Sequence, residues 1–340
     1  MECRGRSQQP RGISLARLEL SEFKPHWPWA NRHLQSIVPS ILPRGRILAR
    51  SAPLRTAARE LLLDCGEGVR LQAFESTPPN ASGRLAVLVH GWEGSADAYY
   101  ILSLGQALFD AGVQVVRLNL RDHGDTHHLN KGIFHSCRLD EVCGAVAAIG
   151  AQHPGQAPWL VGFSLGGNFM LRVAASQDPR LGPLSGVIAV SPVLHPDSAM
   201  LAMEHGWQVY QRYFVHKWNR SLRRKQSLWP GELKLDDISA FGDLRRMTAV
   251  LVSQHTAFPG MKEYLDGYAI TGERLRTLAA PATILCADDD PIIPASDLAR
   301  LAQTPLLRVV RQRRGGHMGF FTSPFAPSWI DGFVREQMGV

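Results

Sequence analysis

Cysteine is scarce in this sequence, and the pattern of its five residues excludes the common cysteine-based scaffolds. The number is odd, and no two of them form a C-x-x-C pair (Cys3, Cys65, Cys137, Cys143 and Cys286). This distribution argues against a disulfide framework and against a zinc site, and it favours reduced thiols. We therefore expect a cytoplasmic protein.

Long apolar runs are absent as well. No run approaches the roughly 20 apolar residues of a transmembrane helix, and residues 1–10 lack the apolar core of a signal peptide. The formal net charge of +7 comes from basic residues spread along the chain, with clusters near 220–225 and 311–314. No nucleic-acid-binding motif accompanies them. We expect neither an integral membrane segment nor a nucleic-acid partner.

Two kinds of apolar segment alternate along the chain, whose 340 residues are 45% apolar and suffice for a large core. Short β-favouring runs end in polar motifs and are followed by segments with helical spacing. The alternation predicts an α/β fold with a mostly parallel sheet of about eight strands and helices on both faces. The expected strands lie at residues 61–74 (a pair joined by a turn), 84–92, 113–120, 159–163, 185–192, 282–287 and 307–310.

The motif Gly162-Phe163-Ser164-Leu165-Gly166 follows one of these strands directly and leads into a predicted helix. A strand that turns sharply into a helix with serine at the corner is a nucleophile elbow. Residues two positions away on either side come too close together to carry side chains, which explains the two glycines. The bare pattern also arises by chance in a glycine-rich turn, so its meaning depends on partners elsewhere in the chain.

Such partners are present in the order Ser, Asp, His. His317 follows the last strand behind two glycines and is the candidate base for Ser164. The acid that orients its imidazole comes from the run Asp288-Asp289-Asp290 after the preceding strand, and the pattern alone leaves all three open. The backbone N–H groups of Leu165 and Trp92 are the expected oxyanion donors.

The stretch from about residue 196 to 280 interrupts the alternation. We expect a flexible N-terminus (1–22), a core in two parts (23–195 and 281–340) and, between them, a helical cap or lid insertion (196–280). Residues 23–37 should pack on the core as an N-terminal arm. Helical spacing from Met200 to Trp218 puts Trp207, Tyr210 and Phe214 near one face. These aromatics either pack on the core or line an acyl pocket.

A loop from His123 to His135 is rich in histidine and also contains Asp125, His127 and His128. That density is typical of metal sites. The loop has no helical H-x-x-x-H pair, and hydrolysis by serine requires no metal. We expect structural hydrogen bonds rather than a metal ion.

Several longer motifs make the chain similar to the α/β-hydrolases, and more narrowly to the YheT-type branch of hydrolases and esterases. They span residues 31–36 (NRHLQS), 90–95 (HGWEGS), 119–130 (NLRDHGDTHHLN), 162–168 (GFSLGGN) and 315–320 (GGHMGF). The resemblance covers about residues 23 to 335. It implies the α/β-hydrolase fold, a Ser–Asp–His triad, hydrolysis of carboxylic esters and no cofactor. It names no natural substrate and no oligomeric state.

The resemblance also selects among the three aspartates. Members of the family usually carry the acid in the pattern G-x-x-D-x-x-x-P after the penultimate strand. Here Ala287 stands in place of the glycine and Pro294 in place of the proline, which assigns the acid to Asp290. A turn shifted by one residue would assign it to Asp289 instead.

The predicted function is therefore that of a serine hydrolase acting on a small-molecule acyl ester. A thioesterase or amidase would use the same triad. A binding protein that merely keeps the fold is a third hypothesis, but such a protein has no need of a nucleophile elbow. Reaction with a fluorophosphonate probe separates the third hypothesis from the other two.

Overall fold

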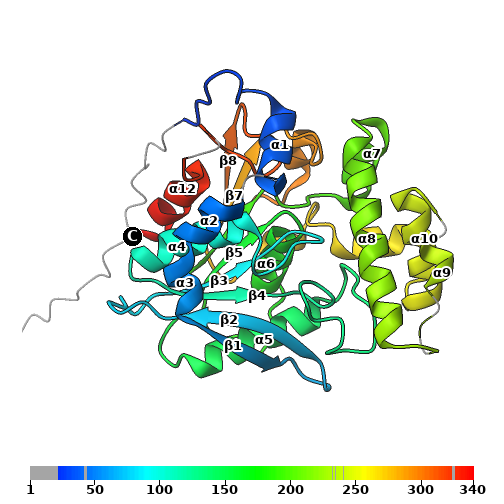
Figure 1. Cartoon of the computed structure of the whole chain (residues 1–340), viewed down its shortest axis with the longest axis horizontal. Helices are drawn as coiled ribbons and strands as arrows, with labels where there is room; N and C mark the ends of the chain where they lie inside the picture. Colours follow the sequence, from blue (N-terminus) through cyan, green and yellow to red (C-terminus); the bar gives the residue numbers. More distant parts are fainter. Residues whose placement is uncertain (1–21, 42–43, 232, 234, 240, 324–325) are drawn as a thin grey trace, which may run out of the picture.

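An eight-stranded sheet forms the centre of the molecule (Figure 1). The computed structural model describes residues 22–340 except 42–43, 232, 234, 240 and 324–325, so the predicted flexible segment 1–22 lies outside it apart from Glu22. The strand order is β1-β2-β4-β3-β5-β6-β7-β8. The strands are β1 (Ala58–Asp64), β2 (Arg70–Ser76), β3 (Leu85–Val89), β4 (Gln114–Leu118), β5 (Trp159–Phe163), β6 (Gly186–Val190), β7 (Ala282–Ala287) and β8 (Leu307–Gln312).

The sheet is mostly parallel, as the alternating sequence predicted. β2 runs antiparallel to both β1 and β4, and all the other neighbouring pairs are parallel. The central strands β3 (LAVLV) and β6 (GVIAV) are buried at every position, whereas the edge strand β1 alternates between buried and exposed residues over its second half. Continuous apolar runs are expected where helices cover both faces of a parallel sheet.

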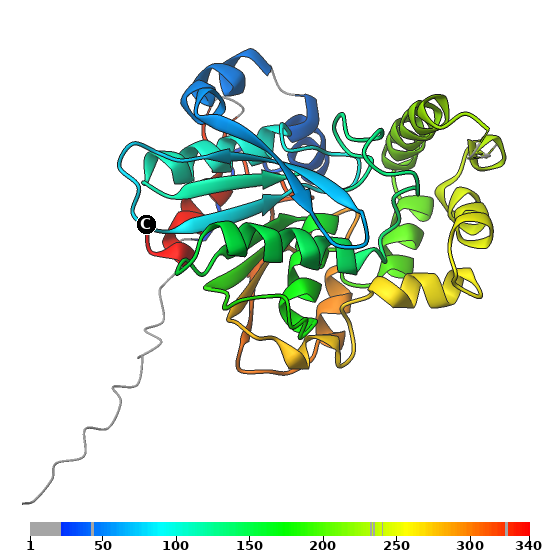
Figure 2. The ribbon, with the colours of Figure 1, turned by 90° about the horizontal axis from the view of Figure 1, so that it is seen from below.

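Helices cover each face, and successive residues of β3 contact opposite layers. Val87 belongs to the apolar cluster that contains α5 (Leu139–Gln152) and α6 (Leu165–Ala175). Leu88 belongs to the cluster on the other face, with α4 (Tyr99–Asp110) and α12 (Trp329–Met338). Figure 2 shows the sheet between these two helical layers. The predicted fold class is confirmed.

Near the N-terminus, three short helices lie on the α4 side of the sheet (Figure 1). They are α1 (Arg32–Ile41), α2 (Arg44–Arg50) and α3 (Ala52–Thr56). The arm that precedes them packs on the core through Phe23, which is 3% exposed and whose ring lies 5.4 Å from that of Phe320. The arm also contacts the strand β8, because the Phe23 backbone N–H donates a hydrogen bond to the Gln312 side chain.

The chain between β6 and β7 is helical and lies to one side of the sheet (Figure 1). It contains α7 (Pro196–His205), α8 (Val209–Leu228), α9 (Asp236–Ser239), α10 (Leu244–His255), α11 (Met261–Tyr268) and the short 3₁₀ helix η1 (Arg274–Thr277). A second 3₁₀ helix, η2 (Ala295–Arg300), follows β7. Whether this insertion acts as a cap stays a prediction.

The helical span expected from Met200 to Trp218 is broken in the structure. The helix α7 ends at His205, Gly206 adopts an extended conformation, and α8 starts at Val209. A side chain at position 206 would collide with the carbonyl of Ala202, so glycine permits this tight helix end. Trp207 therefore precedes α8 and does not share its helical spacing.

Among the helices of the described residues, none combines the length and apolar character needed to cross a bilayer. The four cysteines in this part of the chain are free thiols. The expected cytoplasmic location stays a prediction.

Candidate active site

Ser164 stands at the corner between β5 and α6 with φ 50° and ψ −116°. Positive φ is strained for a residue other than glycine and persists where the surroundings fix it. Here the glycines on either side allow the close approach. A Cβ at Gly162 would collide with the backbone of Gly166, and a Cβ at Gly166 would collide with the carbonyl of His90. The structure thus gives the strand–turn–helix geometry that the motif predicted.

A continuous hydrogen-bonded chain runs from Ser164 to Asp290. The Ser164 Oγ lies 3.0 Å from His317 Nε2, and His317 Nδ1 lies 2.9 Å from Asp290 Oδ2. The side chains of His317 and Asp290 are 5% and 2% exposed. The second oxygen of Asp290, Oδ1, accepts the backbone N–H groups of Ile292 (2.8 Å) and Ile293 (2.9 Å), which fixes the carboxylate's orientation.

The three adjacent aspartates have different partners. Asp288 pairs with Arg311 at 2.8 Å on the surface. Asp289 Oδ1 accepts the backbone N–H of Gly316 at 2.9 Å, and burial raises the pKa of this carboxyl. Only Asp290 among the three contacts the imidazole of His317, and it is the residue that the family register selected.

Side chains from distant segments hold the backbone around His317. The His317 N–H donates to Ser36 Oγ at 2.8 Å, and the Met318 N–H donates to Ser191 Oγ at 3.4 Å. Met318 (φ 62°) and Phe320 (φ 51°) are both in the left-handed region. Sequence analysis assigned no role to either serine. Ser36 belongs to the motif at residues 31–36 that supported the family resemblance, and this was the one feature of the sequence that could have pointed to it.

The two residues expected to supply the oxyanion donors come from different elements. Leu165 is the first residue of α6, and Trp92 follows β3. Both residues line the same cavity as Ser164. The loop that contains Trp92 is fixed by a hydrogen bond from the Gly91 N–H to the Tyr100 hydroxyl (3.0 Å). The N-terminus of α6 points its free N–H groups toward this region, which favours negative charge there.

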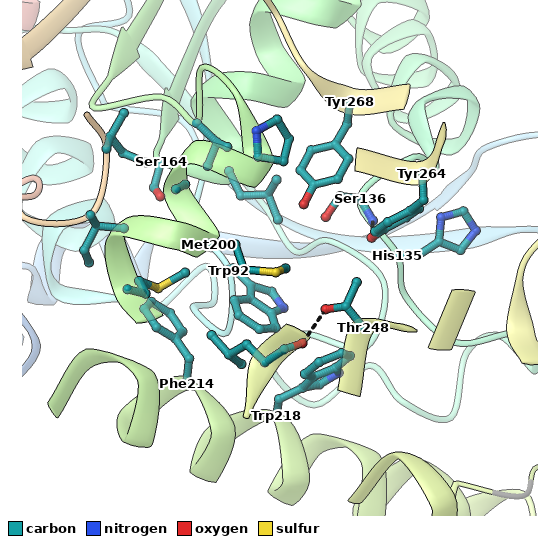
Figure 3. Close-up of a pocket in the computed structure, with 18 of the residues that line it drawn as sticks. Trp92, His135, Ser136, Ser164, Met200, Phe214, Trp218, Thr248, Tyr264 and Tyr268 are labelled. Carbon is teal, nitrogen blue, oxygen red and sulfur yellow. Dashed lines mark hydrogen bonds between the residues drawn. The ribbon is translucent and has the colours of Figure 1, made fainter. Parts of the chain in front are cut away.

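A largely apolar cavity opens beside Ser164 and His317, between the sheet and the helices of the insertion (Figure 3). Its apolar wall comes from α6, α7, α8, α10, the loops after β3 and β6, the loop before α5 and the turn after β7. The side chains are those of Trp92, Phe134, Leu165, Val193, Pro196, Ala199, Met200, Met203, Phe214, Trp218, Leu244, Leu251, Ile292 and Ile293. The Trp92 ring stacks on that of Phe214 at 5.2 Å, so the loop after β3 contacts α8 directly.

Of the three aromatics expected to line a pocket, the structure places only Phe214 in this wall. Tyr210 instead hydrogen-bonds through its hydroxyl to His33 Nδ1 at 2.8 Å. Trp207 packs its ring 5.0 Å from that of His33 and remains 49% exposed. Trp207 and Tyr210 therefore do not line this cavity, and whether they contact a substrate stays a prediction. The break at Gly206 and the docking of α1 direct both rings toward His33.

The histidine-rich loop forms hydrogen bonds rather than a cluster of ligands. His123 Nδ1 lies 2.7 Å from the carbonyl of Arg121, and His127 Nε2 lies 2.8 Å from the hydroxyl of Ser221 on α8. Burial lowers the pKa of His123 to about 4 and that of His127 to about 3, so both rings are neutral at physiological pH. Across the described residues, no three His, Cys, Asp or Glu side chains are grouped to hold a metal ion.

A buried ion pair lies next to this loop. Lys225 of α8 is 1% exposed, and its ammonium donates to Asp122 at 2.8 Å. It also donates to the carbonyls of His127 and Asn130. Burial lowers the pKa of Lys225 and raises that of Asp122, while each partner opposes the shift of the other. The pair fixes α8 to the core beside the cavity.

Residues 86–324 match the model of a protein family described as having the alpha/beta hydrolase fold. No curated protein sequence matches the chain. Among solved structures, an esterase of Pyrococcus furiosus aligns over 83% of this chain and 90% of its own, with a TM-score of 0.55 and 14% identity. The 2,6-dihydroxy-pseudo-oxynicotine hydrolase aligns over 76% of this chain and 61% of its own, with a TM-score of 0.50 and 17% identity. At such low identities these structures share the fold alone.

Proposed function

Since the chain belongs to the family with the alpha/beta hydrolase fold, we propose that it is a serine hydrolase that cleaves carboxylic esters through an acyl-enzyme on Ser164. The observation that carries the proposal is the hydrogen-bonded chain Ser164–His317–Asp290 at the edge of an apolar cavity. A nucleophile, a base and an orienting acid within hydrogen-bonding distance are what acyl transfer requires. The narrower YheT-type assignment remains part of this proposal.

The reaction follows from the positions of these groups. Ser164 Oγ attacks the ester carbonyl while His317 Nε2 removes its proton, and His317 then protonates the leaving alcohol. Asp290 accepts the Nδ1–H of the imidazole and stabilises the imidazolium. Water attacks the acyl-enzyme with the same base. The backbone N–H groups of Leu165 and Trp92 receive the developing oxyanion, and each such donor is worth about a hundredfold or more in turnover.

The cavity indicates the acyl side of the substrate. Because its wall is mainly methionine, aromatic and aliphatic side chains, burying an alkyl chain there is favourable by about 0.8 kcal/mol for each methylene. We therefore assign this cavity to the acyl chain.

The test combines labelling and turnover. The purified protein should react with a fluorophosphonate probe and hydrolyse p-nitrophenyl esters, with thioesters and amides assayed beside them. Ser164→Ala should lose labelling and about a millionfold in turnover, with its circular dichroism spectrum unchanged. If the wild type is labelled but hydrolyses thioesters far faster than esters, the protein is a thioesterase rather than a carboxylic ester hydrolase. Failure of the wild type to label would overturn the proposal.

A further inference from the structure

The wall of the cavity is polar on the side away from Ser164. There, four hydroxyl groups and one imidazole replace the apolar side chains (Figure 3). They belong to Ser136 and His135 in the loop before α5, Thr248 on α10, and Tyr264 and Tyr268 on α11. An acyl cavity for plain alkyl chains has no need of such a group of polar atoms.

Hydrogen bonds to the backbone fix two of these hydroxyls. The Tyr264 hydroxyl accepts the backbone N–H of Ser136 at 3.1 Å. The Ser136 side chain also lies close to the hydroxyls of Tyr264 and Tyr268. Thr248 donates its proton to the carbonyl of Leu244 at 2.7 Å, so its oxygen lone pairs remain as acceptors. These two hydroxyls are preorganised, which reduces the entropic cost of binding a further oxygen.

The polar wall carries no charge at physiological pH. Burial raises the pKa of Tyr264 to about 12 and raises that of Tyr268, whereas burial lowers the pKa of His135 to about 3. The nearby cation of Arg172 donates to the carbonyl of Ser136 and does not line the cavity. A buried carboxylate would lack a partner here and would be costly. A neutral hydroxyl can both donate to and accept from these groups, and an oxo group can accept from them.

We propose that the cavity takes acyl chains that carry a hydroxyl or oxo group away from the ester carbonyl, with Tyr268, Ser136 and Thr248 as its partners. The inference rests on the proposed function, because it assigns the cavity to the acyl chain. A site built to hydrogen-bond a substrate oxygen discriminates strongly against the analogue that lacks it, since the site's own groups then stay unpaired.

The test compares p-nitrophenyl decanoate with hydroxydecanoates whose hydroxyl is moved along the distal half of the chain. For one or more positions, kcat/KM should exceed that of the decanoate by about tenfold or more. Tyr268→Phe should remove most of this preference, measured as the ratio of kcat/KM for the hydroxylated and the plain ester. The matched control Tyr213→Phe removes a hydroxyl on α8 outside the cavity wall and should keep the preference.

Binding separates this inference from the proposed function. Calorimetry on the Ser164→Ala protein with methyl decanoate and methyl hydroxydecanoates needs no turnover. Tighter binding of a hydroxylated ester supports the inference even if no ester is cleaved. An active enzyme that shows no preference at any position, in turnover or in binding, overturns the inference and leaves the serine hydrolase intact.

A different observation supports a second proposal, which concerns α1. Ser36 Oγ accepts the backbone N–H of His317 and donates to the carbonyl of Arg32 at 2.7 Å. The neighbouring Gln35 is 1% exposed. Its Oε1 accepts the Phe321 N–H at 2.8 Å, and its Nε2 donates to the Phe321 carbonyl at 2.7 Å.

Helix α1 also packs closely against residues 315–320, the loop that carries His317. A Cβ at Gly316 would collide with the carbonyl of Arg32, and one at Gly319 would collide with the carbonyl of Gln35. The loop passes directly over the backbone of α1. We propose that Gln35 and Ser36 are positioning residues, which hold the backbone of His317 so that its imidazole reaches Ser164. Misplacement of a catalytic group by about 1 Å can cost a hundredfold in rate.

The test uses Ser36→Ala, Ser36→Thr and the control Ser76→Ala. Ser76 makes a comparable buried hydrogen bond to the Leu54 carbonyl (2.8 Å), on β2. Ser36→Ala should lower kcat and the rate of fluorophosphonate labelling about tenfold with KM unchanged, and Ser36→Thr should restore both. Ser76→Ala should lower the melting temperature alone. If Ser36→Ala changes the melting temperature but neither rate, the positioning role is wrong.

Discussion

Asp289 accepts a hydrogen bond from the backbone N–H of Gly316, the residue immediately before His317. Its neighbour Asp290 contacts the imidazole of His317 itself. Two successive carboxylates thus hold one loop at two points, the first through the backbone and the second through the side chain. They should respond differently to substitution.

Asparagine in place of each aspartate tests this division. Asp290→Asn should reduce turnover about ten-thousandfold, because the imidazole loses the partner that fixes its tautomer. Asp289→Asn should retain most activity, since the amide oxygen can still accept the Gly316 N–H. Asp289→Ala should be the weaker enzyme of that pair. Asp288→Asn loses a surface ion pair with Arg311 and should match the wild type. Kinetics on the purified variants measure these differences. If Asp289→Asn is inactive, Asp289 rather than Asp290 is the acid of the triad.

Chain-length preference should depend on Phe214 and not on Trp207. Phe214 lines the cavity and stacks on Trp92, whereas Trp207 packs against His33 outside it. Phe214→Ala enlarges the cavity, so we expect the optimum in a series of p-nitrophenyl esters to move to longer chains. Trp207→Ala should leave the optimum in place. The same shift in both variants would restore the sequence-based expectation for Trp207.

Stability should fall as the pH rises because of Asp331. Burial raises the pKa of this carboxyl from its ordinary value of 3.8 to about 7, although the Ser103 hydroxyl donates to it at 2.6 Å. The folded state therefore keeps a proton that the unfolded state releases above pH 4. This contribution is complete at low pH and is lost as the pH approaches 7. Asp331→Asn should remove a difference on the order of 2–4 kcal/mol in urea unfolding between pH 5 and 8. An equally steep fall in the variant would contradict the assignment.

The buried pair of Lys225 and Asp122 provides a test of how α8 is held. Lys225→Met leaves the Asp122 carboxylate without its ammonium partner, and such a loss typically costs about 3–5 kcal/mol. The double variant with Asp122→Asn should recover part of that loss, because no unpaired charge remains. Urea unfolding of both variants measures the coupling. Additive losses would show that the two groups act independently.

The sequence predicted the features that depend on neighbouring residues. The sheet followed from apolar runs and the elbow from the two glycines around Ser164, and the choice of Asp290 followed from the resemblance to a family whose acid precedes a proline by four residues. The features it missed depend on contacts between distant segments. Ser36 and His317 are 281 residues apart, and nothing in the spacing of either motif indicates that they meet. The orientation of Tyr210 likewise depends on its hydrogen bond to His33 of α1, which the sequence around Gly206 does not indicate.

Helix α1 carries His33 and Ser36 one turn apart. His33 bonds to Tyr210 at the start of α8, and Ser36 bonds to the backbone of His317. A single helical turn therefore connects a helix that borders the cavity with the loop that carries the base. A displacement of α8 that moved Tyr210 would therefore pull on the same helix that holds the His317 backbone.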